Sequence, residues 1–227
     1  MSKSKNIFFT ESERDTVYKV IRARRDMRHF IPDSKIEKNV LQRILLAAHS
    51  SPSVGLMQPW RFIRVTDLSI RNKIIELVEE ERQNTSKLFG DNKQEFLKLK
   101  VEGIKDCAEL ITVIQAPDDG TILGRRTLPE EMALCSSACA IQNMWLASRA
   151  ENIGMGWVSF FDPVKLSKLL LCPNNSKPIA ILCLGAVKEF YPEPMLQLEG
   201  WRKSKDLNSV VFENYWGEKY NDMDVII

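Results

Sequence analysis

Apolar residues recur at the spacing of an α-helix in several stretches of the chain. Between residues 35 and 49 they stand three or four positions apart, at Ile36, Val40, Leu41, Ile44, Leu45 and Ala48. This period predicts a helix with one buried face. Similar patterns predict helices over about 11–24, 68–83 and 129–150. A further helix is expected from Asp162-Pro163, because Asp caps a helix and Pro fits its first turn.

Shorter apolar stretches predict strands over 61–66, 110–115, 153–161 and 179–187. The patterns Thr10-x-x-Glu13 and Ser34-x-x-Glu37 are typical of capping boxes, and Asp67 is placed to cap the third helix. Helices and strands are mixed without a regular alternation of strand and helix. The predicted fold class is therefore α+β.

Length and composition suit one globular domain over 1–227, with 44% hydrophobic and 27% charged residues. Residues 84–106 are polar with scattered apolar positions and predict a mobile helical lid or insertion. Residues 190–227 are rich in Pro and aromatic residues, and we expect them to form an arm that packs on this subunit or on a partner subunit. Neither a dinucleotide-binding nor a P-loop glycine motif is present.

The charge balance and the cysteines narrow the function classes. A net charge of +2 argues against a nucleic-acid or anionic-membrane partner. No apolar run reaches the roughly 18 residues of a membrane helix, and the first residues lack the apolar core of a secretory signal. The five cysteines lie mostly in apolar surroundings, which predicts buried, reduced thiols in a cytoplasmic protein. Cys135 and Cys139 can share a helix face, but too few further ligands are nearby to predict a metal site.

The densest charge cluster is Arg24-Arg25-Asp26-Met27-Arg28, directly after the first predicted helix. A guanidinium is always charged, and its planar fork fits phosphate oxygens in pairs. Asp26 alone cannot balance three cations. The segment therefore indicates a site for an anion such as a phosphorylated small molecule. The alternative is a solvated basic end of a helix, where cations suit the dipole.

Two further stretches are candidates for ligand contacts. In residues 51–60, Gly55 would permit the close approach of a flat ring, and the Gln58 side chain offers both a donor and an acceptor. In residues 154–159, two glycines precede Ser159, which is expected to be buried and to need a hydrogen-bond partner. The alternatives are an ordinary turn and a serine satisfied within its strand. Arg202 is either a second phosphate contact or a surface cation.

Together these segments resemble the nitroreductase-type flavoproteins and, more narrowly, the flavin-destroying 5,6-dimethylbenzimidazole synthases. General nitroreductases usually carry Ser at the position of Asp26 and Asn within the loop that holds Gly55. The matching segments are RRDMR at 24–28, SPSVGLMQPWRFI at 51–63, VEGI at 101–104, GRRTLPE at 124–130, AIQNMWLASRAENIGMGWVSFFDP at 140–163, LCLG at 182–185, EPMLQLEGWR at 193–202 and VFENYWG at 211–217.

The resemblance implies a three-layer sandwich with helices around a mixed sheet, in a homodimer with two FMN sites at the subunit interface and an extended C-terminal arm. It implies that the opening motif holds the FMN phosphate and ribityl chain, and that the 154–159 segment lies beside the flavin ring. The residues that this assigns to the cofactor are Arg24, Arg25, Asp26, Met27, Arg28, Ser53, Gly55, Gln58, Trp157, Ser159 and Arg202.

The implied activity is the O2-dependent cleavage of reduced FMN to 5,6-dimethylbenzimidazole and erythrose 4-phosphate, which supplies the lower ligand of cobalamin. Asp26 would be the acid/base or orienting carboxylate near the ribityl chain, and Ser159 would hydrogen bond to the flavin edge. The arginines are expected to lower the pKa of Asp26.

Two rival functions share this fold. One is an NAD(P)H-dependent nitro- or quinone reductase or dehalogenase that leaves its FMN intact, and the other is an FMN-binding protein without turnover. The source of reduced FMN is open, and a separate flavin reductase is a candidate partner.

Overall fold

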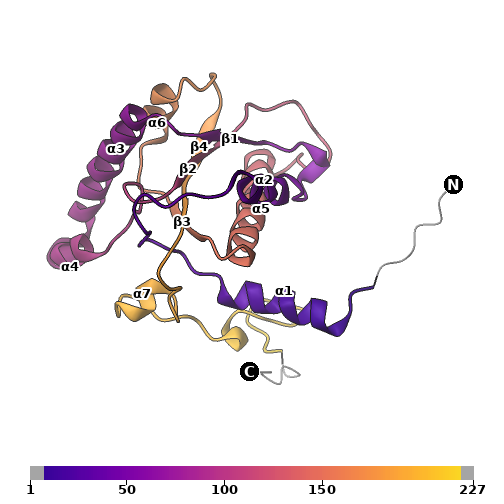
Figure 1. The fold of residues 1–227 in the computed structure, drawn as a ribbon. Helices are drawn as coiled ribbons and strands as arrows, with labels where there is room; N and C mark the ends of the chain where they lie inside the picture. Colours follow the sequence, from indigo (N-terminus) through magenta and orange to yellow (C-terminus); the bar gives the residue numbers. More distant parts are fainter. Residues whose placement is uncertain (1–7, 221–227) are drawn as a thin grey trace. The chain divides into compact units, whose positions relative to one another are not determined.

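A four-stranded sheet lies between two layers of helices in the computed structural model, which describes residues 8–220 (Figure 1). The strands are β1 (Trp60–Arg64), β2 (Glu109–Gln115), β3 (Gly154–Val158) and β4 (Lys177–Gly185), in the spatial order β1-β2-β4-β3. All three pairings are antiparallel. The expected α+β class is confirmed, whereas the expected mixed sheet is wrong for these strands. A parallel pairing occurs as a single bridge between Asp26 and Met155.

The two central strands are buried on both faces, so their side chains alternate between two cores. Ile111 and Leu182 belong to the core beneath one helix layer. Leu110 and Cys183, one position away on the same strands, belong to the core beneath the other layer. This alternation confirms the three-layer arrangement and explains why both strands read as continuous apolar runs.

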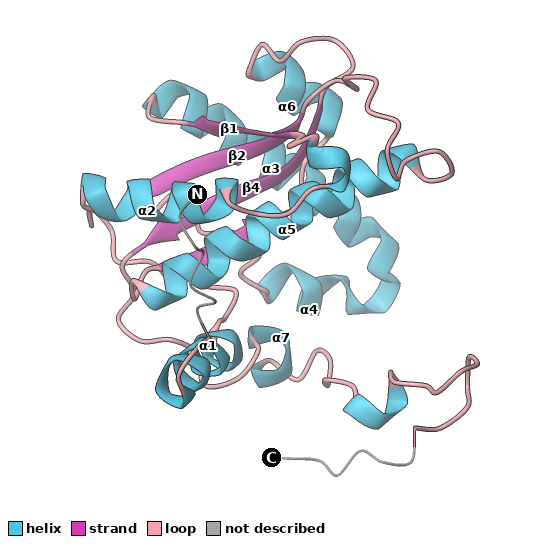
Figure 2. Cartoon of the chain, turned by 90° about the vertical axis from the view of Figure 1, so that its right-hand side faces the viewer, coloured by secondary structure: helices cyan, strands magenta, loops and turns pink. Residues whose placement is uncertain are grey.

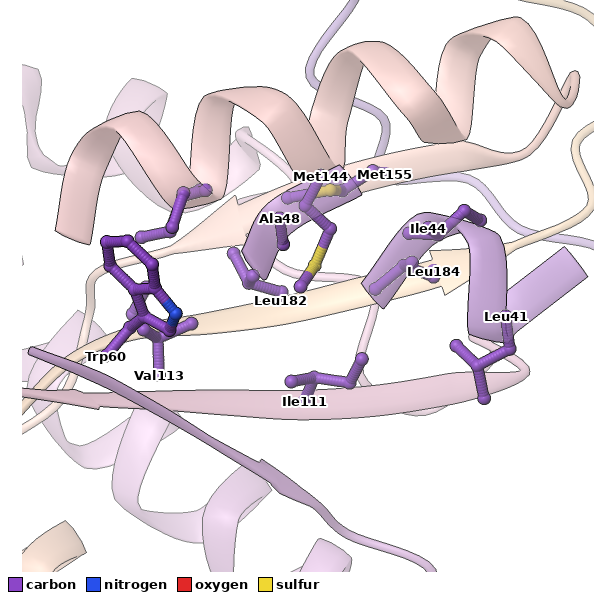
Figure 3. Packing of buried hydrophobic residues seen from close by; sticks show 13 residues of the cluster. Leu41, Ile44, Ala48, Trp60, Ile111, Val113, Met144, Met155, Leu182 and Leu184 are labelled. Carbon is purple, nitrogen blue, oxygen red and sulfur yellow. The ribbon is translucent and has the colours of Figure 1, made fainter. Parts of the chain in front are cut away.

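One face of the sheet is covered by α2 (Lys38–His49) and α5 (Pro129–Ala150) (Figure 2). Leu41, Ile44 and Ala48 of α2 and Met144 of α5 meet the sheet in this core (Figure 3). The bounds of α5 agree with the predicted helix over 129–150.

The other face carries α3 (Leu68–Ser86) and α6 (Pro163–Leu169), which contribute Ile74, Val78 and Leu166 to the second core. Between α3 and β2 lie a 3-10 helix (Lys87–Asn92) and α4 (Lys93–Lys98), so the helical character predicted for 84–106 is confirmed up to Lys98 and wrong for 99–106. Phe96 is only 3% exposed there and stacks on Phe89 at 4.6 Å. Mobility of this segment stays a prediction.

Three of the four predicted capping signals occur at helix starts. Thr10 and Glu13 form the predicted capping box of α1 (Glu11–Ala23), and Asp67 and Asp162 cap α3 and α6. The capping box at residues 34–37 is wrong. Helix α2 begins at Lys38, and the Glu37 side chain makes no capping hydrogen bond. The reason is that residues 34–37 follow a turn and are not helical. The Ser34 hydroxyl is buried without a partner among the described residues.

The cysteines are only partly buried. Cys107 and Cys183 are buried free thiols, as predicted, but Cys135 and Cys139 are exposed on α5 and Cys172 is half-buried. The expectation of burial is wrong for Cys135 and Cys139, because they lie on the side of α5 that faces away from the sheet. Within residues 8–220, no helix has the length and apolar character needed to cross a membrane.

The chain divides into two units, residues 1–192 and 193–227. The second unit contains α7 (Met195–Leu198) and a 3-10 helix (Leu207–Ser209), and none of its described residues is buried. Trp216 is 93% exposed although its ring contacts Phe212. The packing of this arm on a subunit stays a prediction, and its last residues, 221–227, lie outside the described part.

The packing of α3 gives a test of the second core. We expect Ile74→Ala to lower the free energy of unfolding by about 2–5 kcal/mol, because Ile74 is fully buried and the change leaves a cavity. Leu68→Ala on the same helix is the control. Leu68 is 71% exposed, and its loss should stay within about 0.5 kcal/mol. Urea unfolding of both variants is the measurement, and equal losses would contradict the described packing.

Candidate active site

The arginine-rich segment leaves the end of α1 and lies against the edge strand β3. The Met27 N–H donates to the Met155 carbonyl at 2.9 Å, next to the bridge between Asp26 and Met155. A side chain at Gly156 would put its Cβ 2.2 Å from the Met27 carbonyl oxygen, a distance that real Cβ atoms do not reach. This approach therefore requires glycine at position 156, which explains one of the two glycines singled out in the sequence.

The Asp26 carboxylate is held at both oxygens. The Trp157 N–H donates to Oδ1 at 2.9 Å, and Nη2 of Arg28 donates to Oδ2 at 2.6 Å. The Asp26 side chain is 39% exposed and that of Arg28 only 8%. The carboxylate is thus fixed in one orientation while part of it remains open to a ligand.

The arginines lower the pKa of Asp26, as expected, but burial outweighs them, so the pKa is raised overall and the expected net lowering is wrong. Burial raises the pKa of this carboxyl, and the opposing effects of Arg28, the Trp157 N–H and Arg24 offset burial only in part. The physical reason is that the surrounding chain removes part of the water from the carboxylate. This effect depends on the tertiary structure, so the neighbouring charges along the sequence do not reveal it.

The three arginines make different contacts. The guanidinium of Arg24 stacks over the ring of Trp145, with its Cζ 4.6 Å from the ring centroid, and donates no hydrogen bond to any described residue. Arg25 donates to three backbone carbonyls, those of Arg22 at 2.6 Å, Arg24 at 2.8 Å and Pro192 at 2.7 Å. Arg24 is therefore the guanidinium of this segment best placed to receive an anion.

Two aromatic residues that the sequence did not single out support this segment. The indole N–H of Trp145 donates to the carbonyls of Arg25 and Met155, both at 3.1 Å. The Tyr191 hydroxyl accepts from the Arg28 N–H at 3.3 Å and lies 2.6 Å from Nδ1 of His29. Trp145 lies inside a matching segment, but Tyr191 lies in the tail over 190–227, which has no clear hydrophobic pattern, so no local signal identified it.

The residues predicted on β3 and beside it have mixed outcomes. Ser159 is exposed, because the strand ends at Val158, so the expectation of a buried hydroxyl is wrong. Its hydroxyl makes no hydrogen bond within the described chain and is available to a ligand. Trp157 is half-buried, whereas Met27 is fully buried, so contact of Met27 with a ligand would fall to its backbone.

The loop that carries Ser53 is built around its own hydrogen bonds. The Ser53 hydroxyl accepts from the Gln58 N–H at 3.1 Å, and Gly55 has a φ of 57°. A Cβ at Gly55 would lie 2.5 Å from Thr121 Cγ2 and 3.1 Å from the Leu123 carbonyl. In this structure the glycine thus accommodates the chain's own 121–123 segment, and its contact with a flat ring stays a prediction.

This loop does not join the Asp26 cluster within one chain. It contacts α5 at Ser136, whose hydroxyl accepts from the Val54 N–H at 3.2 Å, whereas Arg24 stacks on Trp145. These positions of α5 are about two and a half turns apart and point to opposite sides of the helix. The loop also leads into β1, while Asp26 pairs beside β3 at the other edge of the sheet. Arg202 lies in the second unit, and its phosphate contact stays a prediction.

Comparison of the whole sequence identifies a protein family. The sequence matches the nitroreductase family over residues 21–186. The chain belongs to the nitroreductase family.

Particular relatives are similar over most of their length. The 5,6-dimethylbenzimidazole synthase of Rhodospirillum rubrum is 36% identical over 200 residues, covering 87% of this chain and 94% of that protein. A structure of oxidised iodotyrosine deiodinase bound to FMN and 3-iodo-L-tyrosine has a TM-score of 0.66 at 19% identity, covering 86% of this chain and all of that one. The NADPH:FMN oxidoreductase of Vibrio harveyi has a TM-score of 0.64 at 20% identity, covering 89% and 78%. At such identity the two structures show the shared fold alone.

The raised pKa of Asp26 predicts the sign of a pH effect. Below the unfolded-state pKa of about 3.9, the carboxyl is neutral in the folded and in the unfolded protein. At such pH the free energy of unfolding includes the full contribution of the neutral carboxyl. That contribution is lost as the pH rises through the higher folded-state pKa. We expect the stability of the wild type relative to Asp26→Asn to fall across this window, in urea unfolding at a series of pH values. A difference that rises with pH would show that the arginines outweigh burial.

Proposed function

We propose that this chain is a 5,6-dimethylbenzimidazole synthase, which uses O2 to cleave reduced FMN to 5,6-dimethylbenzimidazole and erythrose 4-phosphate. The product would be the lower ligand of cobalamin. The observation that carries the proposal is the fixed, partly exposed Asp26 carboxylate beside β3, in a nitroreductase-family chain that is 36% identical to a protein of that name.

The residues around Asp26 fit FMN. Arg24 offers a guanidinium that is stacked on Trp145 but donates no hydrogen bond to the described chain, as a phosphate ligand requires. Ser159 offers an exposed hydroxyl next to the end of β3, at a position suited to the polar edge of the flavin ring. When bound, reduced FMN supplies both the electrons for O2 and the carbon atoms of the product.

We assign Asp26 to proton transfer at the ribityl chain. Burial raises its pKa above the ordinary value of an aspartate, and a carboxyl held in place beside a substrate can act as a general acid or base. The Trp157 N–H and Arg28 keep its oxygens in place, so little reorganisation is needed during reaction. Ser159 would hold the flavin edge through its hydroxyl.

We further propose a homodimer whose two FMN sites are shared, with the arginine-rich segment from one subunit and the loop of Ser53, Gly55 and Gln58 from its partner. The position of these segments supports this arrangement, because within a single chain they contact α5 about two and a half turns apart and on opposite sides of the helix. The lack of any buried residue in α1 also supports it, since Val17, Tyr18 and Ile21 remain exposed on one chain.

The chemistry is tested with anaerobically reduced FMN. On admission of air, we expect the wild type to lose flavin absorbance irreversibly and to form 5,6-dimethylbenzimidazole, detected by mass spectrometry. We expect Asp26→Asn to bind FMN but to lose at least about 99% of product formation, which is the size of a typical general acid–base contribution. We expect Ser159→Ala to bind FMN and also to lose product formation, because the proposed hydrogen bond to the flavin edge is removed.

Ser209→Ala, in the exposed 3-10 helix of the second unit, is the matched control and should keep wild-type yield. Full return of oxidised FMN with the wild type would contradict the proposal. That result, with NAD(P)H consumed over many turnovers, would identify an NAD(P)H-dependent reductase, and without turnover it would identify an FMN-binding protein.

The shared site is tested with mixed dimers of Asp26→Asn and Gln58→Ala, both of which we expect to be inactive on their own if the two motifs hold the same FMN. When they are combined, one of the two sites in each mixed dimer has both motifs intact, so product formation should return. The reciprocal dimer of wild type with the Asp26→Asn/Gln58→Ala double variant should be inactive. If both motifs came from the same chain, the two results would be reversed.

A further inference from the structure

The guanidinium of Arg28 makes its hydrogen bonds to other residues of the same chain. Its Nη2 donates to Asp26 Oδ2 at 2.6 Å and to the Trp157 carbonyl at 2.7 Å, while the Trp157 N–H donates to Asp26 Oδ1 at 2.9 Å. The three residues therefore form a closed ring of hydrogen bonds, in which the backbone of β3 holds both the carboxylate and the guanidinium.

The rest of this guanidinium is closed off by the chain. Arg28 is 7% exposed, and its Nε and Nη1 are buried without a hydrogen-bond partner among the described residues. A Cβ on Gly156 would lie 2.5 Å from Nη1, so the backbone of β3 occupies the space beside this nitrogen. A phosphate group needs a guanidinium edge that it can approach, and Arg28 does not present one.

Arg24 has the opposite character within the same five residues. It is only half-buried, it rests on the Trp145 ring, and its guanidinium keeps all its donors for a ligand among the described contacts. The two arginines were equivalent in the sequence, but the fold gives them different environments.

We infer that Arg28 is a positioning residue for Asp26 and not a ligand of the FMN phosphate, an inference that rests on the proposed function. Arg28 fixes the carboxylate through an ion pair made by Nη2, which also donates to the Trp157 carbonyl. Gly156 makes this arrangement sterically accessible. Within the arginine-rich segment, phosphate recognition then falls chiefly to Arg24.

The test compares the binding of oxidised FMN with that of riboflavin, which lacks the phosphate, by flavin fluorescence. Arg24→Met should reduce the preference for FMN over riboflavin about tenfold or more, because it removes charged hydrogen bonds to the phosphate. Arg28→Met should leave the ratio of the two Kd values within about twofold of wild type. An equal reduction of this ratio in both variants would overturn the inference.

A second readout shows whether Arg28 acts through Asp26. Product formation should fall in Arg28→Met, but the Asp26→Asn/Arg28→Met double variant should be no worse than Asp26→Asn alone, because the two residues work as one unit. Losses that multiply in the double variant would contradict a positioning role.

The same variants also show whether a loss of function is caused by a folding defect. Arg28→Met leaves the Asp26 carboxylate without its buried partner and is expected to unfold at a lower temperature than wild type, whereas the double variant should recover part of the loss. If Arg28→Met does not fold, the FMN-to-riboflavin ratio of the double variant, compared with Asp26→Asn, provides the same test.

The outcomes separate the two proposals. If the wild type binds FMN but forms no 5,6-dimethylbenzimidazole, the proposed function fails while the binding ratio still decides the role of Arg28. If the ratio collapses in Arg28→Met while the wild type makes the product, only the inference fails. Absence of flavin binding by the wild type would overturn both.

Discussion

The close approach of residues 26–28 to the edge strand β3 is the constraint on which the proposed site depends. It is permitted by the missing side chain of Gly156 and held by the Met27 hydrogen bond to Met155. This approach brings the Trp157 N–H to the Asp26 carboxylate and closes the site around Arg28. Without this approach, the residues after α1 and those of β3, which are far apart in the sequence, would not form one site.

The site also illustrates how burial competes with charge. Two arginines lie near Asp26, yet the removal of water has the larger effect on its pKa and raises it. A carboxylate in this position is fixed by its partners without being locked into its ionised form. That combination agrees with the proton transfer that we propose for Asp26.

The single chain exposes apolar surface that the proposed dimer would cover. None of the residues of α1 is buried, and in the second unit the Trp216 side chain is 93% exposed. The loop of Ser53 and the cluster of Asp26 lie on opposite sides of α5, so in the proposed dimer each chain would contribute one half of each of two sites. A shared site would tie catalysis to assembly, since a separated subunit would lack part of the flavin's surroundings.

The sequence by itself determined the α+β class, most helix bounds, the caps at Thr10, Asp67 and Asp162, and the segments that resemble the family, because these depend on local periodicity and short-range hydrogen bonds. The tertiary structure decided the antiparallel order of the strands, the exposure of Ser159, the raised pKa of Asp26 and the separate environments of Arg24 and Arg28. Each of these features depends on which segments, distant in the sequence, pack against a side chain and exclude water from it. That information is absent from the spacing of residues along the chain.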